Sequence, residues 1–403
     1  MGEPAAVQPS LGLRFLTGGF LATWILVAAF PLLWILVMSF KLPLDALAAN
    51  PLDVIFGPAT RAARGGLSIV DIFLGFLALV FALRMARALT PVLARQLAGD
   101  QTSPLGRAAA MTIVVAIALV ALVMLLPPLA ALVRAGLAPL PGLNRLAEPV
   151  IGATLEHYRA VWFQHGFHRN FMNSLTITAG VVTVSLTVGT LAGYALARTG
   201  SSLAFWLLII ALVFRALPHS VLVTGYLPPF INSHALLMPF WEAPVIGFLL
   251  KLVAAEPPTL YGQPLAIILV LVSINQPFTI WMLRSFFQTV PTEHDEAARV
   301  DGCSHAQAFR RVIMPVMWPG VITTGLFSFL LAYNDYLVCA LLLDAQSQTM
   351  VPAITQFFNR ETTSTDQIEA IAAAVSITAP LFLLVMVFQR QIVAGLTAGA
   401  VKG

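Results

Sequence analysis

The sequence predicts an all-α fold, a polytopic membrane helix bundle of about eight spans. Of its 403 residues, 59% are hydrophobic and only 10% are charged, and the mean hydropathy is +0.87. Soluble domains carry about 25% charged residues, so this chain could not cover a water-exposed surface. Its apolar runs are about 20 residues long, enough to cross a hydrocarbon core, and they lack the alternating pattern of a β-barrel.

Eight apolar runs are expected to cross the membrane as helices. They are residues 15–40, 67–89, 111–133, 173–197, 203–227, 264–286, 316–343 and 368–391. The first run is too long for the core of a signal peptide and lacks a clear cleavage site, so we expect it to remain as an anchor. An even number of spans puts the N- and C-termini on the same side of the membrane.

The distribution of basic residues favours a cytoplasmic location for both termini. In that orientation more Lys and Arg residues fall inside than outside, as the positive-inside rule expects, and one inside cluster consists of Arg84, Arg87, Arg95 and Arg107. The segment 287–315 is then cytoplasmic. Because the net charge is only +4 and no long basic run is present, nucleic acid is not expected as a partner.

The chain lacks the motifs of an enzyme or of a nucleotide-binding subunit. A P-loop needs a lysine in the pattern G-x-x-x-x-G-K-[ST], and none of the three lysines, Lys41, Lys251 and Lys402, stands in that context. The chain has no H-E-x-x-H, C-x-x-C or G-x-S-x-G pattern, and His165 with His168 does not complete a metal-ligand set. We therefore expect no catalytic residue, metal or cofactor on this chain.

The segment before the seventh span, 291–315, is unusually polar. Thr292 followed by Asp295 resembles a capping box, and so does Ser304 followed by Gln307. Two short helices are therefore expected between the two spans.

A glycine turn is expected between these helices. Gly302 would end the first helix, 293–301, and the second would run to Pro315, where the next span begins. Ala297 and Ala298 would leave one face of the first helix nearly bare, so that another protein could approach its backbone. The acidic residues expected to ring that face are Glu293, Asp295, Glu296 and Asp301. Composition and spacing equally allow an amphipathic loop lying on lipid headgroups.

The spacing in this segment resembles the EAA motif of ATP-binding cassette (ABC) importer permeases, E-A-A-x3-G-x9-I-x-L-P. Here the motif begins at Glu296 and ends at Pro315, with Val312 and Met314 in place of Ile and Leu. The chain is more closely similar to the permease subunits of maltose-type, binding-protein-dependent carbohydrate importers, over roughly 12–41 and 154–403. The segments that fall in that family's order are SFK (39–41), NSL (173–175), RALP (215–218), AARVDG (297–302) and GLTAGAVKG (395–403).

The resemblance implies a function and a set of partners. In that family the EAA loop forms a coupling helix that sits in a groove of a separate ATPase. The docking residues would be Glu293, Glu296, Ala297, Ala298, Asp301, Gly302 and Pro315, with Gly399 and Lys402 of the C-terminal tail. The implied partners are an ABC ATPase dimer that binds ATP and Mg²⁺, a second homologous permease, an extracytoplasmic solute-binding protein, and a sugar, polyol or glycerol-like solute. The implied location is the bacterial cytoplasmic (inner) membrane.

The chain departs from this family by an insertion after the first span. We expect an N-terminal anchor span at 1–41, an inserted two-span hairpin with its flanking loops at 42–150, and a permease core of the six-span, type I class at 151–403, with its coupling loop at 291–315. Because two spans are added, the orientation downstream is preserved. The hairpin is either a peripheral element packed against lipid and the core or a contact to the partner permease.

Polar residues within predicted spans are candidates for the translocation path. A charge at mid-bilayer costs at least ~2.5–3.5 kcal/mol, so it usually faces protein or water. The candidates are Arg215, Asn275, Gln276, Asn334 and Asp335. Asn275, Gln276 and the following proline are expected to interrupt their span, and Arg215 is hypothesised to pair with Asp335. The alternative is that these groups only join helices.

Two other classes of function remain open at the level of sequence. A proton-coupled secondary transporter could use the intramembrane carboxylates Asp71 and Asp335, but it would have no use for an EAA loop. A membrane-embedded enzyme could use Arg215, His219 and Asp335, and it would turn over without an ATPase partner.

Overall fold

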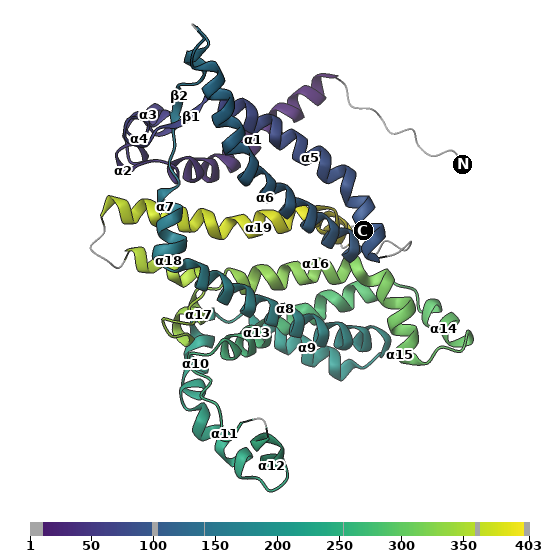
Figure 1. The fold of residues 1–403 in the computed structure, drawn as a ribbon. Helices are drawn as coiled ribbons and strands as arrows, with labels where there is room; N and C mark the ends of the chain where they lie inside the picture. The colour runs from purple at the N-terminus through teal and green to yellow at the C-terminus, as the bar shows by residue number, and fades with distance from the viewer. Residues whose placement is uncertain (1–10, 99–103, 141, 253, 359–362, 399–403) are drawn as a thin grey trace, which may run out of the picture. The chain divides into compact units, whose positions relative to one another are not determined.

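A computed structural model describes residues 11–98, 104–140, 142–252, 254–358 and 363–398, and the chain is overwhelmingly helical (Figure 1). Within these ranges, seven helices are long and apolar enough to cross a membrane. They are Phe15–Met38, Ile69–Leu93, Ile113–Leu137, Phe167–Arg198, Pro264–Phe287, His305–Tyr333 and Ser364–Gln389. They correspond to seven of the eight predicted spans, so the predicted fold class is confirmed.

The span predicted at 203–227 is not one continuous helix. Two shorter helices occupy this region, α9 (Ser202–Arg215) and α10 (His219–Ile231). Pro218 lies between them, and a proline disfavours the helical conformation of the residue before it. The predicted crossing at 203–227 is therefore divided between two helices, and the continuous helix expected there does not form.

The chain forms two compact units, each assembled from segments that are distant in sequence. Unit 1 consists of Met1–Leu74, Ala130–Gln164 and Phe357–Ser376, and unit 2 consists of Gly75–Leu129, His165–Gln356 and Ile377–Gly403. Three long helices, α5 (Ile69–Ala98), α6 (Pro104–Leu137) and α19 (Ser364–Ala398), each contribute to both units.

Unit 1 combines one long helix with many short elements. These are α1 (Leu11–Met38), α2 (Pro43–Ala46), α3 (Pro51–Phe56), α4 (Pro58–Arg64), β1 (Gly66–Ser68), η1 (Asn144–Leu146), β2 (Pro149–Gly152), α7 (Glu156–Arg159) and the wide turn η2 (Ala160–Gln164). Helices α2, α3 and α4 each begin with a proline, whose missing N–H would be unpaired in the first turn anyway. Gly57, at φ +61°, separates α3 from α4.

A buried polar cluster holds the short elements of unit 1 together. The Lys41 ammonium donates to the carbonyl oxygens of Ile55, at 2.9 Å, and of Gly152. The Asp45 carboxylate accepts from the backbone N–H and the hydroxyl of Thr60, both at 2.6 Å. Burial lowers the pKa of Lys41, and the nearby Asp45 carboxylate opposes this shift. Because both charged groups have partners, the cluster stabilises unit 1 rather than leaving a binding site.

The two short strands of unit 1 pair antiparallel, which the sequence did not predict. Gly66 lies opposite Gly152. A Cβ atom on Gly66 would lie 2.0 Å from the carbonyl oxygen of Ile151, so only glycine permits the strands to come this close.

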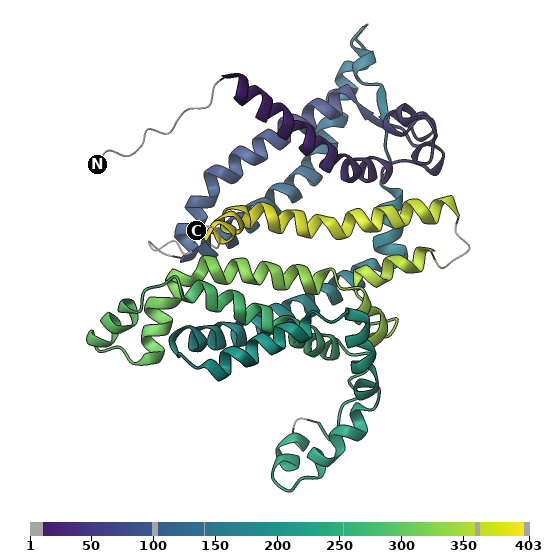
Figure 2. The same ribbon diagram turned by 180° about the vertical axis from the view of Figure 1, so that it is seen from behind.

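Unit 2 is built around three helices that run side by side, α8 (Phe167–Arg198), α13 (Pro264–Phe287) and α16 (Met314–Tyr333), as both ribbon views show (Figure 1, Figure 2). Its other elements are α9, α10, α11 (Ser233–Glu242), α12 (Ile246–Lys251), α14 (Glu293–Val300), α15 (His305–Ala308), the π-helical segment η3 (Phe309–Ile313), α17 (Leu337–Leu342) and α18 (Met350–Phe358), of which the last two residues belong to unit 1.

Small residues allow α8 and α13 to pack closely. A Cβ atom on Gly189 would lie 2.6 Å from the Thr279 methyl group, and one on Gly193 would lie 3.0 Å from the backbone nitrogen of Arg284. This Gly-x-x-x-Gly spacing is the one that lets membrane helices approach each other. The close contact fixes the position of the end of α8.

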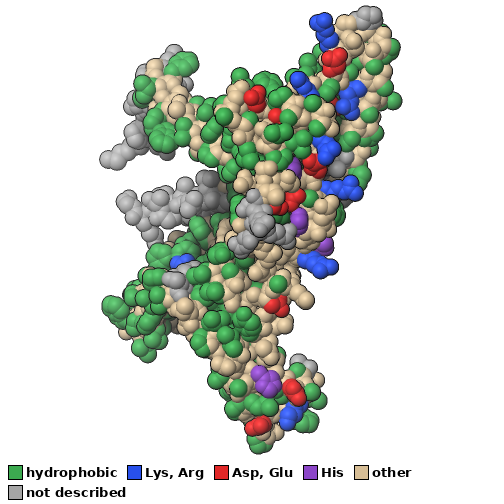
Figure 3. Space-filling model, turned by 90° about the vertical axis from the view of Figure 1, so that its left-hand side faces the viewer, with side chains coloured by type: hydrophobic (Ala, Val, Ile, Leu, Met, Phe, Trp, Pro, Cys, Tyr) green, Lys and Arg blue, Asp and Glu red, His purple; other side chains and the backbone are tan. Residues whose placement is uncertain are grey.

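The described surface is that of a membrane protein. Hydrophobic side chains far outnumber charged ones on the face shown in Figure 3. Helix α1 shows this most clearly, because Phe15 is 80% exposed and Leu16 is 72% exposed. Large apolar side chains are stable in that position only against lipid tails or a membrane partner.

Candidate functional site

The predicted coupling loop, 291–315, begins with α14, which is anchored to the end of α8 by a carboxylate. The Tyr194 hydroxyl donates to Asp295 Oδ1 at 2.5 Å, and Arg198 forms an ion pair with Asp295 Oδ2 at 2.8 Å. Arg198 also donates to the backbone carbonyls of Val290, at 3.1 Å, and Phe287, at 3.4 Å. One arginine therefore positions both the entry to the loop and its first helix.

The predicted capping box at Thr292 does not form. Thr292 is the N-cap of α14, but its side chain makes no capping hydrogen bond. The Asp295 carboxylate is instead occupied by Tyr194 and Arg198. A tertiary ion pair has displaced the local interaction that the sequence suggested.

The turn after α14 and the start of α15 follow the sequence closely. Gly302 has φ +83°, and its N–H and that of Cys303 donate to the carbonyls of Arg299 and Ala298 in the pattern of a Schellman motif. Ser304 and Gln307 form the predicted capping box. The two helices are therefore joined by a turn of fixed geometry.

The outer face of α14 differs from the predicted one. Glu293, Glu296 and Ala297 are exposed, whereas Ala298 is only 5% exposed. Ala298 and the ion-paired Asp295 face the bundle, so they do not belong to the predicted bare and charged surface. Asp301, Gly302 and Pro315 are exposed, which the predicted docking role requires.

An aromatic cluster supports the loop from the bundle side. The ring of Tyr194 lies 4.8 Å from that of Phe309 and 5.4 Å from that of Phe287, measured between centroids. Phe287, Val290 and Ile313 belong to one buried cluster at this end of the bundle. A displacement of the loop is therefore resisted by packing as well as by charge.

The second half of the loop, after Gly302, carries a basic hollow of about 440 Å³, lined by Ala306, Gln307, Arg310 and Arg311. Both arginines are exposed. The helix does not end at Pro315, as predicted, but continues from His305 through η3 into α16 as one span. Arg310 and Arg311 therefore lie on the same continuous helix as the membrane span.

Two of the predicted path residues join helices of the core. Asn275 is 1% exposed and donates to Ser328 Oγ at 2.7 Å, which links α13 to α16. Gln276 donates to the Ser185 carbonyl at 3.4 Å, which links α13 to α8, while its buried Oε1 has no hydrogen-bond partner among the described residues. The interruption predicted here is absent, because α13 continues through Pro277.

Arg215 and Asp335 do not form the hypothesised ion pair. The Arg215 guanidinium lies over the Phe278 ring, 4.6 Å from its centroid, a cation–π contact. Asp335 is 9% exposed, and its Oδ1 accepts from the Cys339 backbone N–H at 3.1 Å. The structure places these two residues in separate environments.

A break follows α16 within the span predicted at 316–343. Helix α16 ends at Tyr333, and α17 begins only at Leu337. Asn334 is exposed and its amide donates to the Leu330 carbonyl at 3.0 Å, while Asp335 satisfies the start of α17. Breaks of this kind at membrane depth occur where the backbone is buried in protein or faces a water-filled cavity.

Two of the predicted docking residues fall outside the described residues. Gly399 and Lys402 lie in the part of the C-terminus that the structure does not describe. Among the described residues, no three His, Cys, Asp or Glu side chains come together as a possible metal site.

Tyr194 and Arg198 were missed at the level of sequence. They stand four residues apart at the end of a predicted span, so they share one helix face. That spacing is the signal in the sequence that could have identified them.

The family model and similar known proteins all describe membrane subunits of transport systems. Residues 185–397 match the model of the family described as "Binding-protein-dependent transport system inner membrane component". The diacetylchitobiose uptake system permease protein DasC of Streptomyces coelicolor is 34% identical over 252 residues, which cover 62% of this chain and 81% of DasC. The trehalose transport system permease protein SugB of Mycobacterium tuberculosis is 31% identical over 62% of this chain and 82% of SugB.

More distant similarities also fall among transporters. The trehalose/maltose transport system permease protein MalG of Thermococcus litoralis is 28% identical over 64% of this chain and 85% of MalG. Among solved structures, a chain of a bacterial ABC transporter that imports alginate has a TM-score of 0.40 and 18% identity, covering 70% of this chain and 96% of that chain. The structural likeness is too distant to support an argument.

Proposed function

The chain belongs to the family of binding-protein-dependent transport system inner membrane components, and on that premise we propose that it is the permease subunit of an ATP-driven sugar importer. The solute is a sugar, as in the names of DasC, SugB and MalG, or a polyol or glycerol-like molecule of similar chemistry. The energy comes from a separate ATPase subunit.

The observation that carries this proposal is the geometry of α14. Its inner side is tied to α8 through Asp295, and its outer side presents Glu293, Glu296 and Ala297. A short helix that is rigidly attached on one side and bare on the other can transmit a displacement from a partner into the bundle. The amphipathic-loop alternative gives no reason for the ion pair with α8.

The partner surface extends beyond α14. The exposed Arg310 and Arg311 in the second half of the loop line a basic hollow, which favours an acidic element of the ATPase next to the groove that receives α14. The ATPase dimer binds ATP and Mg²⁺, and the tail with Gly399 and Lys402 approaches it. A second homologous permease and an extracytoplasmic solute-binding protein complete the assembly.

The same proposal fixes the orientation in the membrane. The coupling loop, the segment with Arg84 and Arg95, and both termini are cytoplasmic. The unit 1 elements around Lys41 and Gly152 are then on the outside. This arrangement follows the positive-inside rule.

The translocation path is proposed to run past the polar groups of α13 and past the break after α16. Gln276 has a buried oxygen without a partner among the described residues, and Asn334 is exposed at the break. These two groups have hydrogen-bonding capacity for a hydroxylated solute. Asn275 has a structural role in comparison, because its amide is committed to Ser328.

Transport works by alternating access in this account. Binding of ATP favours the closed ATPase dimer, and the coupling helices move with it. A ligand can shift a conformational equilibrium only by its differential affinity for the two states. The role of this chain is to convert that shift into movement of α8, α13 and α16.

Uncoupling variants test the proposal. In proteoliposomes that hold the complete transporter, Glu296→Lys should preserve assembly in the membrane but abolish stimulation of ATP hydrolysis by the solute-loaded binding protein. The matched charge reversal Glu148→Lys, at an exposed residue far from the loop in sequence, should leave stimulation unchanged. Normal stimulation and uptake in the Glu296→Lys transporter would contradict the assignment.

A further inference from the structure

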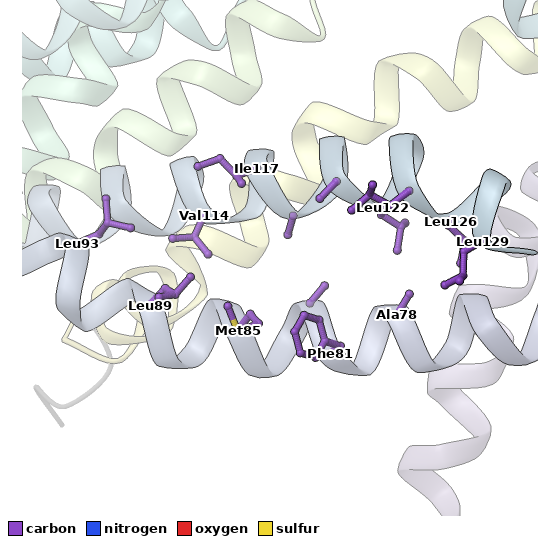
Figure 4. Close-up of a pocket in the computed structure, with 14 residues that line it drawn as sticks. Ala78, Phe81, Met85, Leu89, Leu93, Val114, Ile117, Leu122, Leu126 and Leu129 are labelled. Carbon is purple, nitrogen blue, oxygen red and sulfur yellow. The ribbon is translucent and has the colours of Figure 1, made fainter.

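An elongated apolar groove lies between α5 and α6 in unit 2, with a volume of about 400 Å³. Figure 4 shows its lining side chains pointing toward one another from the two helices, with Phe81 and Met85 on α5 facing Leu122 and Val114 on α6. No charged residue lines it. The groove runs along α5 from Ala78 to Leu93.

The sequence explains why the groove is not filled by its own side chains. Its lining residues recur every three or four positions on both helices, so each helix turns one stripe toward the other. Several positions in these stripes carry only a methyl group, namely Ala78, Ala82, Ala118 and Ala121. Because these small side chains face one another, they leave an unfilled space between the helices, whereas protein interiors are normally close-packed.

The dimensions of the groove select its occupant. Ala78 and Leu93 are 15 positions apart, which is about 22 Å at ~1.5 Å per residue. A volume of about 400 Å³ over that length is much smaller than that of a helix, which with its side chains is about 10–12 Å wide. One hydrocarbon chain fits this space, and a partner helix does not. One leaflet of the hydrocarbon core is about 15 Å thick. The groove is longer than this, so an acyl chain that spans one leaflet can lie in it over the full length of the acyl chain.

The charge at one end of the groove indicates the headgroup. Arg95 is exposed and stands two residues beyond Leu93. The segment 84–107 contains four arginines and one aspartate, and it is cytoplasmic in the orientation of the proposed function. Basic clusters beside membrane helices on the cytoplasmic side attract anionic lipids.

We propose that the α5–α6 hairpin binds an acyl chain of an anionic phospholipid from the cytoplasmic leaflet, with the lipid phosphate held by Arg95. The assignment of this lipid to the cytoplasmic leaflet depends on the proposed function. The binding of a hydrocarbon chain in the groove does not depend on it. The hairpin is then a lipid-filled element in which the lipid takes the place of the missing side chains.

A photoactivatable lipid tests this proposal on the complete transporter in lipid nanodiscs. The probe is phosphatidylglycerol with a diazirine in one acyl chain, and phosphatidylcholine with the same acyl chain serves as the zwitterionic arm. Labelled peptides are mapped by mass spectrometry. We expect labelling of the peptides that contain Phe81–Leu93 and Val114–Leu129 by phosphatidylglycerol, and at least several-fold less by phosphatidylcholine.

Variants separate the groove from general contact with lipid. Ala121→Trp fills the groove and should reduce labelling of these peptides several-fold. Val120→Trp is the matched control, because Val120 is 61% exposed and does not line the groove, and it should label as the unaltered chain does. Arg95→Gln should lower phosphatidylglycerol labelling to the level of phosphatidylcholine. If Ala121→Trp does not assemble, Ala118→Leu makes the same test with a smaller side chain.

Three results would overturn the proposal. Equal labelling of Ala121→Trp and Val120→Trp would show that the groove does not hold the acyl chain. Equal labelling by the two lipids would show that the hairpin does not select an anionic headgroup. Cross-linking of groove residues to a protein segment in place of lipid would assign the groove to a partner helix. A failure of the proposed function would instead appear as normal coupling in the Glu296→Lys transporter, which leaves the labelling pattern unaffected.

Discussion

Replacing Asp295 by Asn should loosen the coupling helix without unfolding the bundle. The substitution preserves shape and one acceptor oxygen for Tyr194, but it removes the charge that pairs with Arg198 at 2.8 Å. Arg198 retains its backbone acceptors at Val290 and Phe287. The entry to the loop should therefore stay in place while α14 itself loses its attachment.

The magnitude follows from the exposure of the pair. The Arg198 and Asp295 side chains are 16% and 17% exposed, so the pair is neither a solvent-screened surface bridge, worth about 0–1 kcal/mol, nor a fully buried one, whose disruption costs about 3–5 kcal/mol. The paired atoms, Arg198 Nη2 and Asp295 Oδ2, form an ion pair without hydrogen-bond geometry, so its loss should cost an intermediate amount, about 1.5–3 kcal/mol. Because ~1.4 kcal/mol is a factor of ten, opening of α14 should become about 10- to 150-fold more frequent.

Amide hydrogen exchange of the purified transporter measures this opening directly. Exchange in 293–302 should accelerate by that factor in Asp295→Asn, while the amides of α13 should be unchanged. Glu293→Gln, an exposed substitution on the same helix, serves as the control and should exchange normally. A double-mutant cycle with Arg198→Gln should give a coupling energy of about 1–3 kcal/mol. Unaltered exchange in Asp295→Asn would refute the claim that this ion pair positions α14.

Four further predictions follow from particular residues. Gly302→Ala should cost about 1–2 kcal/mol of loop stability, because the position requires φ +83°, while a Cβ there meets no neighbouring atom. Amide exchange in the loop should become faster. Gly200→Ala, which has an ordinary φ and also places its Cβ in open space, is the control and should not change exchange. Asn275→Ala should destabilise the bundle by about 0.6–1.7 kcal/mol, the range for hydrogen bonds between membrane helices, seen as a lower midpoint of detergent-induced unfolding, and an unchanged midpoint would show that the bond to Ser328 is not stabilising. Asp335→Asn retains an acceptor for the Cys339 N–H and should preserve insertion while impairing solute uptake by proteoliposomes; normal uptake would remove this charge from the path. His157 is 2% exposed, and burial is the main cause of its lowered pKa, opposed by Glu156 and Glu369. The unfolded chain therefore binds more protons than the folded chain below the ordinary histidine pKa of 6.5, so stability should fall as pH decreases below that value. His157→Gln should then flatten the pH dependence of the thermal midpoint.

The membrane spans could be predicted from sequence because their signal is local. A run of about 20 apolar residues needs no knowledge of its neighbours to be identified as a span. The region of α9 and α10 was predicted as one span from its composition, and a break at Pro218 divides it into two helices. The pairing of Gly66 with Gly152 could not be predicted, since three-residue strands carry no periodicity and their partners are far apart in the sequence.

The coupling loop was partly predictable for the same reason. Gly302 and the Ser304 capping box depend on residues a few positions apart, and both formed as expected. Asp295 was misassigned because a single helical turn contains three acidic residues, and only the position of α8 determines which one faces inward. Likewise, the predicted pairing of Arg215 with Asp335 assumed that two opposite charges in membrane segments must form an ion pair. Arg215 instead contacts an aromatic ring, and Asp335 accepts a hydrogen bond from a backbone N–H.

The most direct test of the account is site-specific photocross-linking from the outer face of α14. A photoreactive amino acid at Ala297, in inside-out membrane vesicles that contain the assembled transporter, should capture the ATPase subunit, and the yield should change when ATP binds. The same photoreactive residue at Ala298, which faces the bundle, should give no such product. Absence of an ATPase cross-link from Ala297, or reaction of that position only with reagents added to the outer side, would contradict the role of this helix in coupling.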